Sequence, residues 1–434
     1  MKNLKHIFPT CLLCCGIAAA FTACTNEVED YFDQTASARL TDMMDHARQV
    51  LRSAEYGWEF EYYPGSTLSY GGIVYTVRFD SLTATVSSSL IADSTVTSYY
   101  RLTNDNGPVL TFDTYNELFH YYSTPSSSEY QAKGGEFEFV IDSIADDFIS
   151  LYGKKTHNTM YMRKLTASPS DYAAHTIDIY DHFVDSIVGT IGTAELTAKC
   201  NPSNRSIMVM SGGDTTTVHY TYTNRGIRLY RPLRLGGLSV QTFDFDTGSN
   251  LLTCTDPGIT DVQLQGIPYS SNFMNFSRYE GDYILAYEGA SVDVKLTPNR
   301  MEGTYILSGL SPKYTLTLRY DAETGDLRLG SQVVGESNGR TVYWVCFDYV
   351  DGYLSLYDEG QFTIRWNGNR FYPRFNFSAT NPNVLNCNGG LLIYLYYNDA
   401  GSLAAAVLDD TAWLTNGSQQ FRGLSSLNRK TRLD

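Results

Sequence analysis

Residues 335–339, GESNG, have the spacing of a serine nucleophile motif, G-x-S-x-G. That motif supports acyl transfer when a strand precedes the serine and a helix follows it, because the tight turn between them exposes the hydroxyl. Here the next residues, 340–349, read RTVYWVCFDY and are rich in β-branched and aromatic side chains. Such residues favour a strand. The motif therefore predicts a hairpin turn, and Ser337 is not expected to be catalytic.

The histidines and cysteines do not have the spacing of a metal site. After the leader, the chain contains neither H-E-x-x-H nor C-x-x-C, which are compact patterns that zinc ligands form. His175 and His182 are seven residues apart on a helical pattern and can share one face. A pair without a third ligand nearby is typical of a surface or a packed face. We therefore predict no metal and no cofactor.

Acidic residues leave a hydrolase open as an alternative. The chain has 47 Asp and Glu residues, and glycoside hydrolysis needs two carboxyl groups held roughly 5–10 Å apart in a cleft. In residues 113–122, DTYNELFHYY, Asp113, Glu117 and His120 can converge on a short helix. We interpret that segment as an ordered turn over the mouth of a barrel. A hydrolase would need two carboxylates, or one with His120 or His157, in a deep pocket. No catalytic residue is assigned.

A short pattern recurs in which an aromatic residue and an aspartate precede a turn and a new strand. Aspartate accepts local backbone N–H groups and glycine adopts positive φ, so the pattern predicts hairpins. A calcium loop is the alternative for Asp244 and Asp246, but the twelve-residue ligand set and its terminal glutamate are missing. The pattern favours a β-meander and occurs at residues 79–86, 243–252, 320–329 and 347–356.

Aromatic side chains are the remaining candidates for ligand contacts. The chain has 34 Tyr and 21 Phe but only 4 Trp. Tyrosine combines an apolar ring with a polar hydroxyl and suits β-surfaces in contact with water. Trp58, Trp344, Trp366 and many tyrosines can stack on sugar rings or peptide side chains, although alternating aromatics in strands usually pack the core. The ligand-binding residues stay unassigned.

Cys24 is the residue whose function the sequence supports best. Lys2 and Lys5 form a short positive region near the start of the chain, and residues 7–21 form an apolar run of signal-peptide length, too short to span a membrane. The run ends FTAC at residues 21–24, which is similar to the lipobox of bacterial lipoproteins. We therefore predict that residues 1–23 are a signal peptide and that Cys24 carries an acyl anchor. An ordinary secretory peptide with a chance cysteine is the alternative.

Residues 24–33, CTNEVEDYFD, form an acidic tether. Acids directly after the lipidated cysteine resemble the signal by which lipoproteins of Bacteroides-like bacteria reach the outer face of the outer membrane. A solvated tether that is acidic by chance is the alternative. We expect a protein that is lipid-anchored in the outer membrane and faces the cell exterior.

Charge and cysteine content limit the partners and the redox state. Removing the two leader lysines takes the formal net charge from −15 to −17. Such a surface repels nucleic acid, so no nucleic-acid partner is expected. An oxidising envelope would permit disulfides within the proposed domains, and four buried thiols are the alternative. The cysteines concerned are Cys200 with Cys254 and Cys346 with Cys387.

The hydrophobic patterns predict a mostly β protein of two or three domains. Apolar residues at helical spacing predict an amphipathic helix over 34–56 and a second helix near 172–188. Short alternating runs elsewhere predict antiparallel, lipocalin-like β-barrel or sandwich units. The expected parts are a helix plus barrel-like domain at 34–166, a helix plus β domain at 170–268, a C-terminal β domain at 276–410 and a loose tail at 411–434.

Several segments resemble an uncharacterised lipoprotein family of Bacteroides-like bacteria that carries a domain of unknown function. The resemblance covers residues 28–270 and is weaker beyond them. It implies no catalytic residues. It does imply an accessory role beside an outer-membrane nutrient transporter and its surface lipoprotein. The segments that carry it are SAEYGWEFEYYP (53–64), NDNGPVLTFDTYNELFHYYS (104–123), GGEFEFVI (134–141), GKKTHNTMYMRKL (153–165) and YTNRGIRLYRPLRLGGLSVQTFDFD (222–246).

Together these observations predict a surface lipoprotein that binds a glycan or a peptide without catalysis, in support of nutrient acquisition. A structural or adhesive surface protein is one alternative, and a hydrolase with an unrecognised site is the other. An aromatic platform in a groove would favour ligand capture, whereas an open edge strand on a smooth surface would favour assembly.

Overall fold

The computed structural model describes residues 35–88, 95–105, 107–126, 129–356, 360–406, 408 and 414–433. Cys24, the signal peptide and the acidic tether lie outside the described residues. The chain divides into two units, residues 1–46 and 47–434, and every described strand belongs to the second. The described part is mostly β and antiparallel, as the sequence predicts, with three α-helices.

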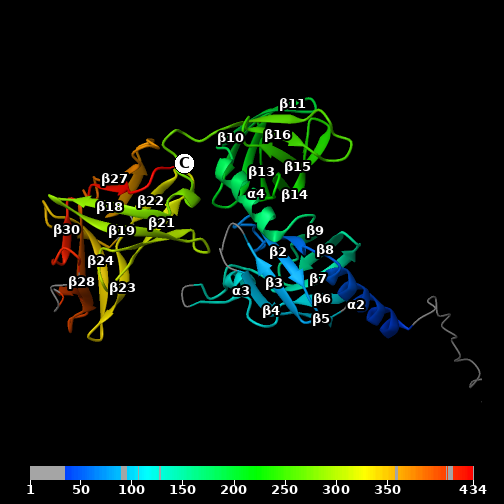
Figure 1. The fold of residues 1–434 in the computed structure, drawn as a ribbon, viewed down its shortest axis with the longest axis horizontal. Coiled ribbons are helices and arrows are strands. Elements are labelled where there is room, and N and C mark those ends of the chain that lie inside the picture. Colours follow the sequence, from blue (N-terminus) through cyan, green and yellow to red (C-terminus); the bar gives the residue numbers. More distant parts are fainter. Residues whose placement is uncertain are drawn as a thin grey trace, which may run out of the picture. The chain divides into compact units, whose positions relative to one another are not determined.

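The first sheet has nine strands in the order β4-β3-β2-β1-β9-β8-β7-β6-β5 (Figure 1). Every neighbouring pair is antiparallel, and β1 lies between β2 and β9. Phe60 and Tyr62 of β1 are fully buried. The strands are β1 (Trp58–Tyr62), β2 (Ile73–Phe79), β3 (Thr83–Ser87), β4 (Thr95–Tyr99), β5 (Arg101–Asn104), β6 (Pro108–Thr111), β7 (Glu138–Ile144), β8 (Phe148–Gly153) and β9 (Thr159–Lys164).

Two helices accompany this sheet, α2 (Ala36–Arg52) and α3 (Glu117–Ser123). Toward the end of α2, apolar residues that recur at helical spacing are buried, and Trp58 Nε1 donates to the carbonyl of Leu51 at 2.8 Å. This agrees with the predicted packing of the helix against a sheet. Asn116 caps α3, because its side-chain oxygen accepts the N–H of Leu118 at 3.2 Å.

The second sheet is an eight-stranded barrel in which each strand pairs with the next one along the chain. Helix α4 (Pro169–His182) precedes it, somewhat earlier than the predicted 172–188. Strand β11 alternates strictly, with Leu196, Ala198 and Cys200 buried and the residues between them exposed. The strands are β10 (Ser186–Ile191), β11 (Ala194–Asn201), β12 (Ser206–Ser211), β13 (Asp214–Tyr222), β14 (Gly226–Leu235), β15 (Leu238–Asp246), β16 (Leu251–Cys254) and β17 (Gln263–Ile267).

This up-and-down order is lipocalin-like, but the barrel interior is filled. The space inside measures about 30 Å³ and is lined by apolar side chains alone, among them Ile191, Ile227 and Leu264. Eight strands leave an interior that side chains can fill completely, and the volume here is close to that of one water molecule. The interior of this barrel therefore has no room for a ligand.

The third sheet is a second closed barrel of eight strands. Its last strand, β31, pairs with both β18 and β27, and Leu427 on it is fully buried. The loose tail predicted for 411–434 is therefore wrong over this segment, because β31 closes the barrel. The strands are β18 (Gly281–Tyr287), β19 (Ala290–Asn299), β20 (Thr304–Ser308), β21 (Leu316–Asp321), β22 (Asp326–Leu329), β26 (Phe362–Trp366), β27 (Arg374–Ala379) and β31 (Ser426–Arg429).

A fourth sheet is built from two insertions into this barrel, between β22 and β26 and between β27 and β31. Trp344 is fully buried in the core that this sheet shares with the barrel. Trp58 and Trp366 are buried as well, so these three tryptophans pack the core. The strands are β23 (Gln332–Ser337), β24 (Arg340–Asp348), β25 (Tyr353–Ser355), β28 (Gly389–Tyr397), β29 (Leu403–Ala406) and β30 (Gln420–Arg422).

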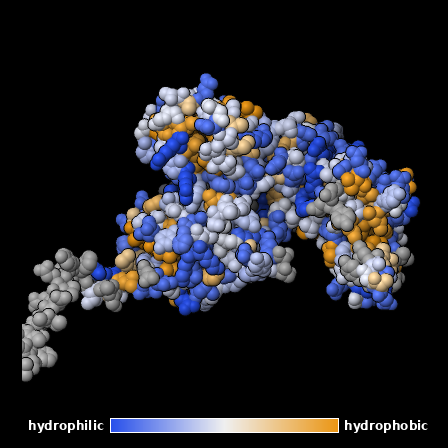
Figure 2. All heavy atoms as spheres, turned by 180° about the vertical axis from the view of Figure 1, so that it is seen from behind, coloured by the Kyte–Doolittle hydropathy of each residue, from blue (hydrophilic) through white to orange (hydrophobic). Residues whose placement is uncertain are grey.

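Hydrophilic side chains cover much of the face that Figure 2 presents, with hydrophobic ones in smaller patches. Large side chains that are exposed include Tyr130, Tyr353 and Tyr372. No helix among the described residues has the length and apolarity needed to cross a bilayer.

Candidate functional site

The serine motif forms the predicted hairpin. Gly335 and Ser337 belong to β23, and the chain turns at Asn338 and Gly339 before β24 begins. Both turn residues have positive φ, 50° and 71°, which is the geometry of a two-residue hairpin. Ser337 is followed by a strand and not by a helix, so the structure does not provide a nucleophile elbow.

Three of the candidate histidines contact backbone carbonyls close to them in sequence. His120 Nδ1 lies 3.0 Å from the Asn116 carbonyl, and its ring stacks on Phe137. His175 and His182 each place Nδ1 2.9 Å from a carbonyl one turn earlier in α4. No group of three His, Cys, Asp or Glu side chains that could hold a metal occurs within the described part of the chain.

The three side chains of the segment 113–122 do not form a catalytic cluster. Asp113 makes an ion pair with Arg101. Glu117 is exposed in the first turn of α3. His120 faces Phe137 and Tyr115. The segment is ordered, as predicted, but it is a capped short helix beside a nine-stranded sheet and not a turn over the mouth of a closed barrel.

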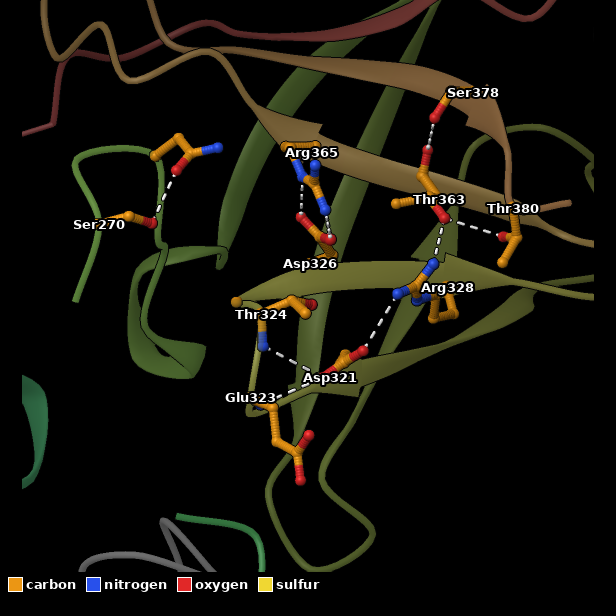
Figure 3. Close-up of polar contacts among 12 residues, drawn as sticks. Ser270, Asp321, Glu323, Thr324, Asp326, Arg328, Thr363, Arg365, Ser378 and Thr380 are labelled. Atoms are coloured by element: carbon orange, nitrogen blue, oxygen red, sulfur yellow. Dashed lines mark hydrogen bonds and ion pairs between the residues drawn. The ribbon is translucent and has the colours of Figure 1, made fainter. Parts of the chain in front are cut away.

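The four aromatic-Asp segments share one hydrogen-bonding arrangement. In each, a carboxylate oxygen accepts the backbone N–H groups two and three residues further on. Figure 3 shows this for Asp321, which accepts from Glu323 and Thr324 at 3.1 and 3.2 Å and also from Arg328. The hairpin prediction is confirmed, and the carboxylates are Asp80, Asp246, Asp321 and Asp348.

A cleft of about 410 Å³ lies within the second unit and is lined mainly by tyrosines and charged side chains. Its size falls in the range typical of small-molecule sites. Loops and helix ends from all three barrel or sheet regions supply the walls. The lining residues are Tyr70, Tyr121, Tyr122, Glu129, Lys133, Tyr180, Pro202, Ser203, Arg205, Phe276, Arg300, Met301, Glu302, Gly303, Tyr320 and Ala322.

Helix α3 and the loop before β2 hold three of the tyrosines. The Tyr121 and Tyr122 rings meet edge to face at 4.9 Å, and Tyr70 meets Tyr122 at 5.5 Å. Lys133 Nζ lies 4.7 Å from the Tyr121 ring centre, within range of a cation–π contact. Burial raises the pKa of Tyr122 to about 12, so its hydroxyl stays protonated at neutral pH. These rings form an ordered aromatic wall.

The β21–β22 hairpin supplies two further lining residues of the cleft, Tyr320 and Ala322. The Tyr320 hydroxyl donates to the Met274 carbonyl at 2.9 Å, and its ring packs on Phe276. Asp321 fixes the backbone of the same hairpin (Figure 3). Asp321 therefore holds a hairpin that supplies part of the cleft lining.

Among the tyrosines, Tyr180 comes from α4 and packs edge to face on Tyr222 at 5.4 Å. Burial raises the pKa of Tyr180 to about 12 against the opposing charge of Arg205. The cleft therefore presents neutral phenols beside fixed charges. Rings of this kind stack on apolar ligand faces, and the polar groups around them set orientation.

Cys200, Cys254, Cys346 and Cys387, the four cysteines in the described part of the chain, are buried free thiols. Burial raises the pKa of Cys200 to about 12. Burial, together with the neighbouring Cys346 thiol, also raises the pKa of Cys387. The structure therefore agrees with the alternative of four buried thiols and not with the two disulfides.

The sequence did not single out the residues of the cleft. Tyr121 and Tyr122 lie in the same segment as Asp113, Glu117 and His120. The remaining lining residues are scattered along the chain from Tyr70 to Ala322. The high tyrosine content was the available signal. It indicated aromatic contacts but not which tyrosines make them.

Comparison with known proteins gives a family without a known activity. No curated protein matches the chain. Residues 255–393 match a domain of unknown function, DUF4987. Residues 28–247, just over half of the chain, match the model described as Domain of unknown function (DUF4302). That match covers the first sheet and six of the eight strands of the first barrel. The chain therefore belongs to the DUF4302 family.

Proposed function

We propose that this protein is a lipid-anchored surface protein of Bacteroides-like bacteria that binds a glycan or peptide in its tyrosine-lined cleft. It does so without catalysis, as an accessory to an outer-membrane nutrient transporter and its surface lipoprotein. The tyrosine-lined cleft of about 410 Å³ is the observation that carries this proposal. The filled interior of the first barrel supports it, because that barrel leaves no room for a ligand.

The polar groups of the cleft fit binding better than hydrolysis. Glu129 pairs with Lys133 at 2.6 Å, and Glu302 lies near Tyr121, whose pKa is raised by burial and by the Glu302 charge. Each carboxylate thus has a close neighbour in the wall of the cleft. His120 and His157, the histidines considered for a hydrolase, do not line the cleft. A ligand incubated with the protein should therefore be recovered unchanged.

A binding screen tests the proposal. The chain from residue 25 to 434 is presented with glycans and peptides, and binding is measured by calorimetry. Tyr121→Ala removes an aromatic face and should weaken binding by roughly tenfold or more, as for a buried aromatic contact. Tyr121→Phe keeps the ring and should retain most of the affinity.

Tyr372→Ala, at an exposed tyrosine outside the cleft, serves as the matched control and should bind like the wild type. Absence of binding to every glycan and peptide would leave ligand capture unsupported. Equal loss in the Tyr121 and Tyr372 variants would place binding outside the cleft. Cleavage of any ligand would favour the hydrolase.

The anchor is tested separately in intact cells. Cys24→Ala should release the protein from the membrane fraction, because the acyl chains supply the attachment. Protease added to whole cells should degrade the wild-type protein. Full protection from the protease would contradict exposure at the cell surface, and retention of Cys24→Ala in the membrane would contradict the lipid anchor.

A further inference from the structure

Arg205 has an unusual backbone for its residue type. It lies at the end of the β11–β12 turn, and its φ of 46° falls in the left-handed region that favours Gly and Asn. The turn is held by Asn201, whose side-chain oxygen accepts the N–H of Ser203 at 3.0 Å. Such strain persists where the surroundings impose it, and it is common at functional positions. The strained backbone therefore marks the Arg205 side chain as a candidate functional group.

The guanidinium of Arg205 has donors that the protein does not use. One nitrogen, Nη1, donates to the Tyr70 carbonyl at 3.1 Å. Nε is buried and has no hydrogen-bond partner. Among the described residues, no carboxylate forms an ion pair with Arg205, whereas Glu129 of the same cleft pairs with Lys133.

The charge of Arg205 acts inside the cleft. Burial raises the pKa of Tyr122 and of Tyr180, and the Arg205 charge opposes both shifts. The guanidinium thus lies close to two cleft tyrosines. With Lys133 and Arg300 the cleft lining has three cations against two carboxylates, Glu129 and Glu302. A local positive charge in a chain of net charge −15 is selective for an anionic group.

We propose that Arg205 binds the carboxylate of a sugar acid, so that the cleft is specific for a uronate-containing oligosaccharide. This inference rests on the proposed function. Arginine binds carboxylates through paired N–H groups, and tyrosine rings stack on the C–H faces of sugars. Five tyrosines line the cleft, and their ring faces beside fixed charges suit the C–H faces and the acid group of such a sugar. An acidic glycan therefore fits better than an acidic peptide.

The test uses the chain from residue 25 to 434 and three probes: an oligogalacturonate, its methyl-esterified form and an oligoglutamate peptide. The wild type should bind the oligogalacturonate at least roughly tenfold more tightly than the ester, because the ester cannot form the charged pair. The preference should weaken as salt is added. Arg205→Asn should abolish the preference, and Arg205→Lys should restore part of it.

Thermal unfolding of the variants checks separately that they are folded. Asn tolerates positive φ, so Arg205→Asn should unfold at a temperature close to that of the wild type. Arg234→Asn, at an exposed arginine of β14, is the matched control and should keep the preference. Equal binding of acid and ester would overturn the role of Arg205 while leaving glycan binding intact. Tighter binding of the peptide would assign the cleft to acidic peptides. Binding of none of the probes would overturn the uronate specificity, and the screen with other ligands would then decide the proposed function.

Discussion

At the scale of single residues, aspartate determines four hairpins of this protein. Each of the four carboxylates accepts two N–H groups of its own turn, so an anionic acceptor stabilises a backbone that would otherwise leave donors unpaired. The sequence predicted this role because the interaction is local. For Asp80, the N–H groups of Thr83 and Leu82 lower the carboxyl pKa to about 2.

The low pKa of Asp80 gives a pH dependence with a definite sign. The ionised form is favoured in the folded chain, so its contribution to stability is present above the ordinary pKa of 3.8 and is lost as the pH falls toward 2. Asp80→Asn keeps an acceptor oxygen but does not titrate. The difference in unfolding free energy between wild type and Asp80→Asn should shrink between pH 4 and pH 2. A difference that stays constant over this range would contradict the assignment.

At the scale of elements, the first sheet and the first barrel are joined by buried charges. Glu59 and Glu61 of β1 both bind Arg228 of β14, and Glu61 also binds Arg163 of β9. In an alternating strand, charged residues such as these usually lie on a face that contacts water. The structure instead buries Glu61 to 1% exposure, because the barrel covers that face. The partner arginine is distant in sequence, so no local pattern could reveal it.

Removal of Arg228 should be costly for this junction. Arg228→Met leaves two carboxylates buried without their main partner and should lower the free energy of unfolding by about 3–5 kcal/mol. Arg225→Met breaks the exposed Arg225–Asp244 pair on the same barrel and should cost about 0–1 kcal/mol. Urea denaturation of both variants checks the comparison. Similar costs for the two would show that burial of the pair does not control its strength.

At the scale of the whole molecule, the sequence predicted the class of fold better than the site. Periodicity alone indicated a mostly β chain and the helices near α2 and α4, since those signals are local. It misjudged residues 411–434, because β31 is short and polar and is recognised only by the barrel that it closes. The cleft could not be predicted for a similar reason, because its walls come from segments far apart in sequence.

The central claim is that the tyrosine-lined cleft is the ligand site, and a crystal structure of the protein with its best ligand from the screen tests it most directly. The ligand should lie between Tyr121 and Tyr320, with its carboxylate on Arg205. A ligand seated instead on exposed tyrosines such as Tyr353 or Tyr372, with the cleft empty, would contradict it.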